Sequence, residues 1–325
     1  MSLVSVVMCT YRRPHLLPRA VDCVIAQTHR PLELVLTDDG SEDDTPRVME
    51  ELAGKCGATG VSANFAMKPN GGVASARNAG MGRARGDYVA FLDDDDTWQP
   101  QKISKQMAEL ERCGADACCC QFLQVREKDE RHMPPSPDQL LRGRGPSAYI
   151  TRSADAHINS IVVKSEVARR VGPFDETLRV YEDFDWIVRL LCEADFACVP
   201  EVLGRYEYTA GSLFKFKGYE QLLSRDEMQE KAVLGVREKC RAKPTWDDSA
   251  WQTRVAQDFD QFIKHRLYAG ELGAARLLYD RALSLGASPE LIQGARRKMR
   301  KAWWLSLLGL RLKHPKFGQI AQVKG

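Results

Sequence analysis

Short apolar runs alternate with segments of helical periodicity through the first third of the chain. Strands are expected at residues 4–8, 32–37, 64–67 and 87–92. Helices are expected at residues 16–27, 43–52 and 72–85. The run at 4–8 is β-branched and apolar on both faces, which is typical of a central parallel strand. Strands that alternate with helices of about a dozen residues predict βαβ units, so we expect an α/β fold with a mostly parallel sheet flanked by helices.

The remainder of the chain has a different pattern. Residues 126–146 are charged and rich in Pro and Gly, which is typical of a mobile loop. Residues 158–163 predict a further strand, and residues 182–192 predict a helix with acidic residues in its first turn, where the helix dipole favours them. From about residue 220 the chain is helical, and residues 270–285 resemble a helix–turn–helix pair with tetratricopeptide-like spacing. One such unit is too short for a solenoid, so we expect a helical appendage.

Polar or acidic residues directly follow three of the expected strands. They are Thr10-Tyr11, Asp38-Asp39 and the run Asp93-Asp94-Asp95-Asp96. In open α/β sheets, ligands bind outside the carboxyl ends of the strands, and parallel strands present those ends at one edge. We therefore expect a ligand site at this edge of the sheet.

The four consecutive aspartates repel one another unless a cation is present. Hard oxygen ligands of this type suit magnesium or manganese, which substrate phosphates commonly complete. A solvated acidic turn is the other interpretation, but the apolar strand before the run favours a position at the sheet edge. Asn70-Gly71-Gly72 with Arg77 is compatible with a glycine turn beside a polar helix face, or with backbone that approaches a diphosphate. This segment is neither a P-loop nor a dinucleotide-binding glycine motif.

The composition allows a sizeable core and excludes wholesale disorder, since 44% of the 325 residues are hydrophobic and 28% are charged. The net charge of +3 is unevenly distributed. Residues 291–325 hold nine Lys or Arg and no Asp or Glu, which leaves residues 1–290 with a net charge of −6. The ten cysteines form no C-x-x-C pair, so we expect reduced thiols in a cytoplasmic protein. We find neither a signal peptide nor an apolar run of about 18 residues.

Six segments together identify the family that the chain resembles. They are V-S-V-V-M-C-T-Y-R-R-P (4–14), L-V-L-T-D-D-G-S-E-D-D-T (34–45), N-G-G-V-A-S-A-R-N (70–78), Y-V-A-F-L-D-D-D-D-T-W (88–98), V-G-P-F-D-E-T-L (171–178) and Y-E-D-F-D-W-I-V-R-L (181–190). In this order they resemble glycosyltransferase family 2, the inverting enzymes of GT-A fold. The resemblance implies a Rossmann-like GT-A domain at residues 1–215, with a nucleotide-sugar half at about 1–100 and an acceptor half at about 101–215. A helical C-terminal region occupies residues 216–325.

The resemblance implies roles for the residues at the strand ends. The nucleotide-sugar-binding residues are Thr10, Tyr11, Asp38, Asp39, Asn70, Arg77, Asp93 and Asp94. The first four surround the nucleobase, where Asp39 bonds the base and Asp38 supports its loop. The next two reach the nucleotide or the diphosphate.

The acidic run corresponds to the D-x-D motif of the family, which implies a divalent metal cofactor, manganese or magnesium. Asp95 binds the metal and Asp93 binds the ribose or the metal, with Asp94 in the variable middle position. Because four aspartates stand in a row, a register displaced by one residue remains an alternative.

The Glu182-Asp183 pair supplies the expected catalytic residues, with Asp183 as the base. In a single displacement the acceptor hydroxyl attacks the anomeric carbon opposite the leaving nucleoside diphosphate, so a carboxylate must take its proton. The metal and Arg77 neutralise the charge that develops on the diphosphate. Asp185 is a nearby alternative base, and capping of the helix N-terminus is the structural interpretation of the pair.

The chain departs from the family pattern after the E-D helix. Many relatives have a His there, in a Y-R-x-H-like segment, whereas Tyr206-Glu207-Tyr208-Thr209 places Thr at that position. We interpret His157 as a surface or core histidine, with contact to the acceptor as the alternative. We interpret Trp186 as helix packing, with a sugar platform as the alternative.

Residues 296–316 combine basic side chains with Trp303-Trp304 and several leucines. This pattern favours peripheral contact with an anionic membrane, and a helix docked on the catalytic domain is the alternative. The net negative charge of the preceding residues and the lack of binding motifs argue against nucleic acid as a partner. We therefore expect a cytoplasmic protein with peripheral attachment to the inner face of the cytoplasmic membrane.

The predicted function is the inverting transfer of a hexosyl or N-acetylhexosaminyl group from a nucleotide-sugar, a UDP-sugar, to a hydroxyl of a glycan or lipid-linked acceptor. Synthesis of bacterial surface polysaccharide or lipopolysaccharide is the expected setting. A catalytically silent sugar-nucleotide-binding or scaffold protein is the alternative, although such a protein has no reason to keep Asp95 and Asp183. A nucleotidyltransferase needs a Gly- and Lys-rich phosphate loop, which residues 10–14 do not form.

Overall fold

The computed structural model describes residues 1–126, 129–207 and 218–314. The chain forms two compact units, Met1–Ala210 with Lys243–Thr245, and Gly211–Ala242 with Trp246–Gly325. Tyr208 and Thr209, residues 315 and 316 of the basic tail, and the expected domain boundary at 215 and 216 lie outside the described residues.

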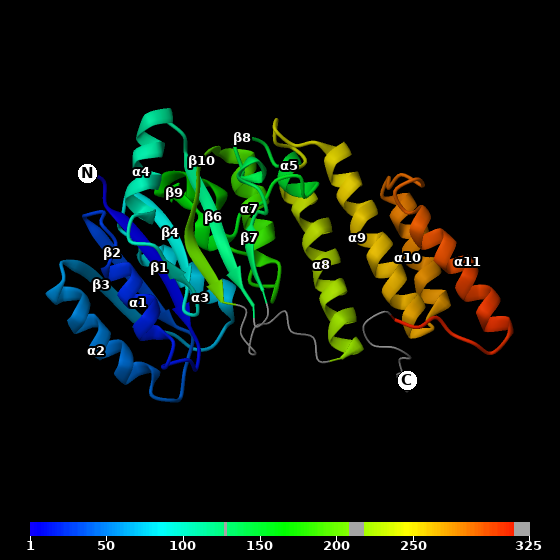
Figure 1. Ribbon diagram of the computed structural model, residues 1–325, viewed down its shortest axis with the longest axis horizontal. Helices are drawn as coiled ribbons and strands as arrows, with labels where there is room; N and C mark the ends of the chain where they lie inside the picture. The colour runs from blue at the N-terminus through cyan, green and yellow to red at the C-terminus, as the bar shows by residue number, and fades with distance from the viewer. Residues whose placement is uncertain (127–128, 208–217, 315–325) are drawn as a thin grey trace. The chain divides into compact units, whose positions relative to one another are not determined.

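The first unit is built on one ten-stranded sheet (Figure 1). Its strands are β1 (Val4–Thr10), β2 (Leu32–Asp38), β3 (Val61–Met67), β4 (Tyr88–Asp93), β5 (Thr97–Trp98), β6 (Ala117–Val125), β7 (Glu130–Met133), β8 (Gly143–Arg144), β9 (Val162–Lys164) and β10 (Asp195–Glu207). Its helices are α1 (Leu17–Ile25), α2 (Thr45–Ala58), α3 (Val73–Arg83), α4 (Lys102–Cys113), α5 (Ser147–Ile150), α6 (Ser165–Val171) and α7 (Glu182–Glu193). Two short 3₁₀ helices are η1 (Pro137–Gln139) and η2 (Ile158–Ser160).

The strand order is β3-β2-β1-β4-β9-β6-β10-β5, with β7 beside β6 and β8 beside β10. The pairs β3–β2, β2–β1, β1–β4 and β6–β10 are parallel. The short strand β9 lies between β4 and β6 and is antiparallel to both. The expected α/β class with a mostly parallel sheet is confirmed.

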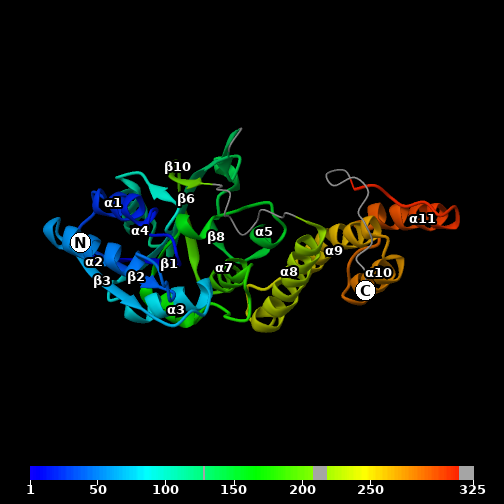
Figure 2. The same cartoon turned by 90° about the horizontal axis from the view of Figure 1, so that it is seen from below.

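Helices cover both faces of the sheet (Figure 2). One apolar core lies between the sheet and α1, α2 and α4, and the other lies between the sheet and α3, α6 and α7. In β1, Val6 and Met8 face the first core and Val7 faces the second. This alternation follows from the two-residue period of a strand, and it explains why a central strand is apolar throughout.

Two expected elements of the first unit differ from the structure. The prediction of a mobile loop at residues 126–146 is wrong. The described part of this segment contains β7, which pairs with β6, and β8, which pairs with β10. Charged side chains are common on strands that lie at the edge of a sheet, so the charge did not indicate a loop. The strand expected at residues 158–163 is shorter, because Ile158–Ser160 forms η2 and β9 begins at Val162.

The second unit is helical, which confirms the expected helical C-terminal region. Its described helices are α8 (Tyr219–Cys240), α9 (Asp248–Ala269), α10 (Leu272–Ser284) and α11 (Gln293–Leu307), and α9 contacts the other three. The helix–turn–helix pair expected at residues 270–285 is wrong. Gly270 ends α9 with φ of 82°, which glycine adopts at little cost, and α10 is a single helix. None of the described helices combines the length and the apolar character that a membrane span requires.

Candidate active site

The carboxyl ends of β1, β2 and β4 lie side by side because β1 pairs with both of its neighbours. In the register of the sheet, Thr10 is opposite Asp38, and Cys9 is opposite Asp93. The three polar segments that follow these strands therefore meet at one edge of the sheet, as expected from the sequence.

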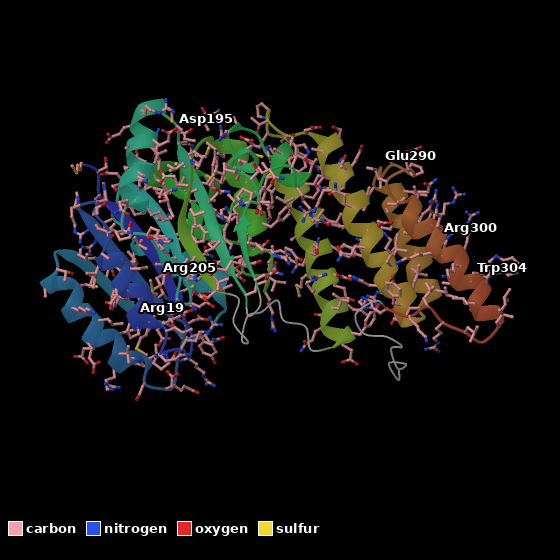
Figure 3. All side chains as sticks on the ribbon, in the orientation of Figure 1. Arg19, Asp195, Arg205, Glu290, Arg300 and Trp304 are labelled. Atoms are coloured by element: carbon pink, nitrogen blue, oxygen red, sulfur yellow. The ribbon has the colours of Figure 1, made fainter. Side chains whose placement is uncertain are left out.

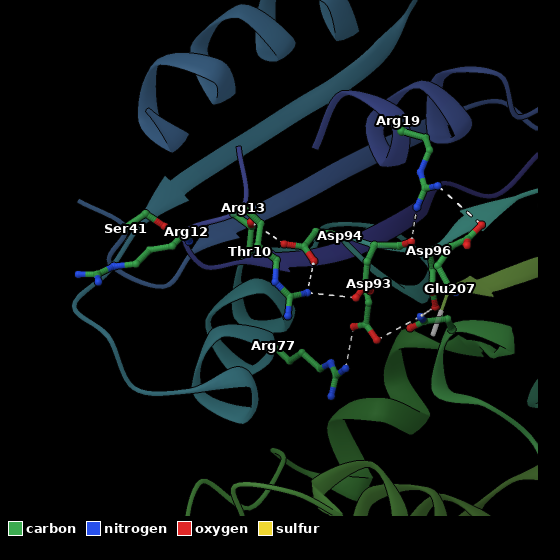
Figure 4. Close-up of polar contacts among 12 residues, drawn as sticks. Thr10, Arg12, Arg13, Arg19, Ser41, Arg77, Asp93, Asp94, Asp96 and Glu207 are labelled. Atoms are coloured by element: carbon green, nitrogen blue, oxygen red, sulfur yellow. Dashed lines mark hydrogen bonds and ion pairs between the residues drawn. The ribbon is translucent and has the colours of Figure 1, made fainter. Parts of the chain in front are cut away.

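The hydroxyl of Thr10 fixes the loop that follows β4. It donates to Oδ2 of Asp94 at 2.6 Å, and both residues are buried (Figure 4). The Nη1 atom of Arg13 lies 3.1 Å from Oδ1 of Asp94 and 3.1 Å from Oδ2 of Asp95. Burial raises the pKa of Asp94 to about 6, although Thr10 and Arg13 act to lower it. The acidic run is thus held against the end of β1.

Asp38 shapes the turn that follows β2. Its Oδ1 accepts from the Ser41 hydroxyl at 2.6 Å and from the Ser41 N–H at 3.2 Å. The Ser41 Oγ in turn accepts from the N–H of Arg12 at 2.7 Å, which ties this turn to the segment after β1. Gly40 has φ of 82°, and a Cβ there would lie 2.8 Å from the backbone nitrogen of Asn70. The turn therefore requires glycine.

Asp39 organises the segment that leads into α3. Its Oδ1 accepts from Lys68 Nζ at 2.8 Å and from the N–H of Gly71 at 3.0 Å, and its Oδ2 accepts from the N–H of Gly72 at 2.7 Å. The Nδ2 atom of Asn70 donates to the Asp39 carbonyl at 3.0 Å. Asp39 is buried, and its carboxylate holds the glycine turn in this arrangement.

Arg77 joins the end of β4 to the start of α7. Its Nη2 lies 2.7 Å from Oδ1 of Asp93, and its Nη1 lies 2.8 Å from Oε1 of Glu182. Arg77 is only 5% exposed, and its guanidinium carbon lies 5.6 Å from the ring centroid of Phe174. Burial acts to lower the pKa of Arg77, but the charges of Asp93 and Glu182 raise it well above its usual value. The guanidinium thus remains charged between two carboxylates.

The Glu182-Asp183 pair opens α7 with two different environments. The preceding Tyr181 has φ of 66°, a strained conformation for a residue with a Cβ. Glu182 is buried, and burial raises its pKa to about 7, with the Asp183 charge adding to the effect and Arg77 opposing it. Asp183 is half-buried, and its Oδ1 accepts from the N–H of Phe184 at 2.7 Å. Among the described residues, no hydrogen-bond partner meets Oδ2 of Asp183.

Asp185 and Trp186, two residues of α7 with alternative interpretations, are fully buried. Asp185 is 0% exposed and pairs with Nε of Arg189 at 2.9 Å, which favours a structural role for Asp185 and leaves Asp183 as the expected base. Trp186 is also 0% exposed, and its ring stacks on Phe174 with centroids 4.9 Å apart. The packing interpretation of Trp186 is confirmed, because a buried indole presents no platform to a sugar.

Asn159 belongs to the site and was not expected from the sequence, whereas its partner Asp96 stands in the acidic run expected at this edge of the sheet. The Nδ2 atom of Asn159 donates to Oδ2 of Asp93 at 3.2 Å and to Oδ2 of Asp96. Both Asn159 and Asp96 are 0% exposed, and Oδ1 of Asp96 accepts from the N–H of Glu207 at 3.2 Å. Asn159 lies in η2, 66 positions from Asp93, and no local pattern marks it in the sequence.

His157 lies close to the same network. Its ring stacks on Phe122 with centroids 5.7 Å apart and contacts the ring of Tyr206 at 5.0 Å. Burial acts to raise the pKa of Asp93, but Arg77 and, to a smaller extent, His157 lower it below its usual value. Contact of His157 with an acceptor stays a prediction.

Asp93 and Asp95 have the chemistry of metal ligands, but the described residues contain no group of three or more His, Cys, Asp or Glu side chains suited to a metal. Their side chains are 26% and 13% exposed, whereas Asp94 and Asp96 are more deeply buried. Magnesium and manganese are commonly held by one or two carboxylates, with substrate phosphates and water as the other ligands. Asp93 and Asp95 therefore fit a metal that binds together with a nucleotide.

Nine of the expected site residues form two groups at the edge of the sheet, Asp183 follows Glu182 at the start of α7, and Tyr11 is exposed. The first group contains Thr10, Arg77, Asp93, Asp94, Asp95 and Glu182. The second group contains Asp38, Asp39 and Asn70. Tyr11 is 41% exposed, with the guanidinium of Arg12 over its ring at 5.2 Å. Arg13 and Arg19 also belong to the site and were not predicted; Nη2 of Arg19 donates to the carbonyl of Asp95 at 2.5 Å.

A model of the family described as Glycosyl transferase family 2 matches residues 5–176, and the chain belongs to this family. An uncharacterized glycosyltransferase of Rickettsia prowazekii is 27% identical over 188 residues, which are 56% of this chain and 57% of that protein. The succinoglycan biosynthesis protein ExoO of Rhizobium meliloti is 26% identical over 251 residues, 73% of this chain and 71% of ExoO. The match thus spans little more than half the length of the Rickettsia relative.

Two solved structures are similar in fold. TarS of S. aureus, residues 1–349 in complex with UDP-GlcNAc, has a TM-score of 0.58 and 14% identity, covering 95% of this chain and 93% of that one. The mannosyltransferase PcManGT of Pyrobaculum calidifontis, in complex with GDP-Man and Mn²⁺, has a TM-score of 0.60 and 16% identity, covering 95% and 88%. At these identities the likeness concerns the fold alone, and it confirms the expected GT-A architecture.

Proposed function

We propose that this chain transfers a sugar from a nucleotide-sugar to a hydroxyl of a glycan or lipid-linked acceptor, with inversion at the anomeric carbon. The observation that carries the proposal is the bridge that Arg77 makes between Asp93 and Glu182. It holds the acidic run after β4 beside the start of α7, where Asp183 stands. A site for a charged donor and a candidate base are therefore adjacent, as an inverting displacement requires.

The nucleotide-binding part of the proposed site lies at the carboxyl ends of β1 and β2, at the edge of the sheet. Thr10, Tyr11, Asp38 and Asp39 surround the base in this proposal, and Asn70 lies toward the rest of the nucleotide. UDP is the proposed nucleotide, which the complex of TarS with UDP-GlcNAc supports. The complex of PcManGT with GDP-Man makes GDP the nucleotide to test against it.

Asp93 and Asp95 would hold a divalent metal, manganese or magnesium. In this register of the D-x-D motif, Asp96 is not a metal ligand and instead bonds Asn159. The metal would act as a Lewis acid that neutralises charge on the leaving diphosphate. Both terminal nitrogens of Arg77 are engaged by carboxylates, so Arg77 acts by positioning Asp93 and through its charge. The Arg13 side chain is 33% exposed and is the more accessible guanidinium for the diphosphate.

Asp183 is the proposed base. Its Oδ2 takes the proton of the acceptor hydroxyl as the hydroxyl oxygen forms its bond to the anomeric carbon and the diphosphate oxygen departs. General-base assistance of this kind contributes about 10²–10⁴-fold in rate. Glu182 is the proposed positioning residue that keeps Arg77 beside the reacting groups.

The proposed acceptor belongs to bacterial surface polysaccharide or lipopolysaccharide, and the proposed sugar is a hexose or an N-acetylhexosamine. The role of ExoO in succinoglycan biosynthesis supports a polysaccharide acceptor. The N-acetylglucosamine of the TarS complex supports an N-acetylhexosaminyl donor.

The experiment measures thermal unfolding with UDP, GDP, dTDP and CMP, each with and without manganese. A ligand at 100 times its Kd adds about 2.7 kcal/mol, which is a shift of a few degrees in Tm. A manganese-dependent shift with UDP that is lost in Asp95→Ala, and kept in the exposed control Asp44→Ala, supports the donor site. No shift with any nucleotide contradicts the donor site and favours a scaffold. Asp183→Asn tests the second half of the proposal, since it should bind nucleotide normally and transfer no sugar.

A further inference from the structure

Helix α11 is anchored to the second unit by one face. Ala295 and Ala302 are buried where α11 contacts α9 and α10. The N–H of Ala295 donates to Oδ1 of Asp260 at 2.8 Å. Lys298 bonds the hydroxyl of Tyr268, and its Nζ lies 4.6 Å from the centre of that ring. The orientation of α11 is therefore set, and its opposite face is presented outward.

The outward face ends in a cluster of exposed large apolar side chains, which we call the apolar tip. Its members and exposed fractions are Trp303 (52%), Trp304 (64%), Leu307 (60%), Leu308 (74%) and Leu310 (53%). The two indole rings contact each other with centroids 4.9 Å apart. Soluble monomers rarely expose several large apolar side chains together, and such patches mark interaction surfaces.

Basic residues occupy the same outward face, from about two turns to less than one turn before the apolar tip. Arg296, Arg297, Arg300 and Lys301 are all exposed, and Figure 3 shows Arg300 and Trp304 projecting from the outer side of α11. A rise of 1.5 Å per residue places Arg300 about 10 Å along the axis from Leu307. The four basic side chains thus precede the apolar tip along the helix axis, with Lys301 two positions before Trp303. No Asp or Glu occurs in residues 291–325.

We propose that the apolar tip inserts into the interface of an anionic phospholipid bilayer, with the four basic residues at the level of the lipid phosphates. Indole rings favour the boundary between headgroups and acyl chains, and each Lys or Arg near an anionic surface contributes about 1 kcal/mol. Because the basic residues precede the apolar tip along the axis, the C-terminal end of α11 enters first, with the helix at an angle to the membrane plane. The four basic residues, with no acidic residue nearby in the sequence, favour an anionic lipid surface over a neutral one.

The test is sedimentation of the full chain with vesicles of phosphatidylcholine alone or with phosphatidylglycerol. Wild type should bind the anionic vesicles, and binding should weaken with salt because exposed charges are screened. The variant R296Q/R297Q/R300Q/K301Q should lose on the order of 100-fold or more in partitioning to anionic vesicles. W303S/W304S should lose on the order of 10-fold or more, since burial of two indoles is removed. The matched controls are L277S, an exposed leucine of α10 (73% exposed), and R169Q/R170Q on α6, which should bind as wild type does.

Shallow brominated lipids supply a readout of position. Tryptophan fluorescence should be quenched on vesicle binding in wild type, and the lipid-dependent quenching should disappear in W303F/W304F. Absence of binding to anionic vesicles at low salt overturns the proposal, as does binding that W303S/W304S leaves unchanged. A dimer that W304S dissociates, with no vesicle binding, assigns the tip to a second copy of the chain instead. Each readout is independent of sugar transfer.

Discussion

The Nη1 atom of Arg77 lies 2.8 Å from Oε1 of Glu182, a residue 105 positions further along the chain. Its Nη2 is simultaneously 2.7 Å from Asp93, so one buried guanidinium joins α3, β4 and α7. The two carboxylates would repel each other without it, and the positions of both therefore depend on Arg77. This dependence leads to the first prediction.

Replacement of Arg77 by Met should lower the free energy of unfolding by roughly 3–5 kcal/mol, because two partly or fully buried carboxylates lose their partner. R77K should be intermediate, since one ammonium group lacks the fork that reaches both carboxylates. Chemical denaturation measures the change. R85M, at an exposed arginine just after α3, is the control and should leave stability unchanged. In the double variant R77M/E182Q the loss should be smaller than in R77M, and strict additivity would contradict the proposed coupling.

Glu182 should make stability depend on pH. Its pKa is about 7 in the folded state, above the usual 4.5, so the folded state holds the proton more tightly than the unfolded state. The resulting stabilisation is fully present below about pH 4.5 and is lost as the pH rises through about 7. The free energy of unfolding of wild type should therefore fall across this pH window relative to that of E182Q, by at most about 3 kcal/mol. Parallel stability curves for the two proteins between pH 4 and 8 would show that the shift is absent.

Asp183 and Asp185 should separate catalysis from stability on the same helix. D183N should lower kcat by about 10²–10⁴-fold while Tm changes little, because the half-buried side chain loses only a proton acceptor. D185N removes the charge that pairs with Arg189 in the core and should lower Tm clearly. Steady-state kinetics gives kcat, and thermal unfolding gives Tm, for both variants. Full activity in D183N would exclude Asp183 as the base.

Asn159 should act on the metal through Asp93. Removal of its amide in N159A leaves Asp93 and Asp96 without their shared donor, and groups that orient metal ligands typically contribute 10- to 100-fold in metal affinity. The half-saturating manganese concentration for sugar transfer should rise by about that factor. Nucleotide-dependent activity at saturating manganese should be affected much less. An unchanged manganese requirement would indicate that Asn159 serves packing alone.

Sequence reasoning located the site through the strand ends. Apolar runs with polar residues at their carboxyl ends predict strands and their direction, and parallel pairing then places Thr10, Asp38 and Asp93 together. The edge of the sheet was therefore predictable before any contact was known. Asn159 was not, because it lies in η2 and reaches Asp93 only through the packing of β9 between β4 and β6.

The local pattern also misled in particular places. The charge of residues 126–146 concealed β7 and β8, since edge strands and loops have similar composition. The acidic start of α7 left both Asp183 and Asp185 as candidate bases, and only the tertiary structure shows that Asp185 is buried and paired with Arg189. Trp186 was likewise resolved by burial, which depends on what packs against the helix rather than on the helix itself.

The sequence by itself determined the α/β alternation, the family and the edge of the sheet where the polar residues collect, because strand and helix periods and turn residues are local properties. The tertiary structure decided which carboxylates share Arg77, which aspartates are buried, and that the tip of α11 remains exposed. These outcomes depend on side chains that approach from distant segments. Their charge, burial and partners are set by packing, which no local pattern contains.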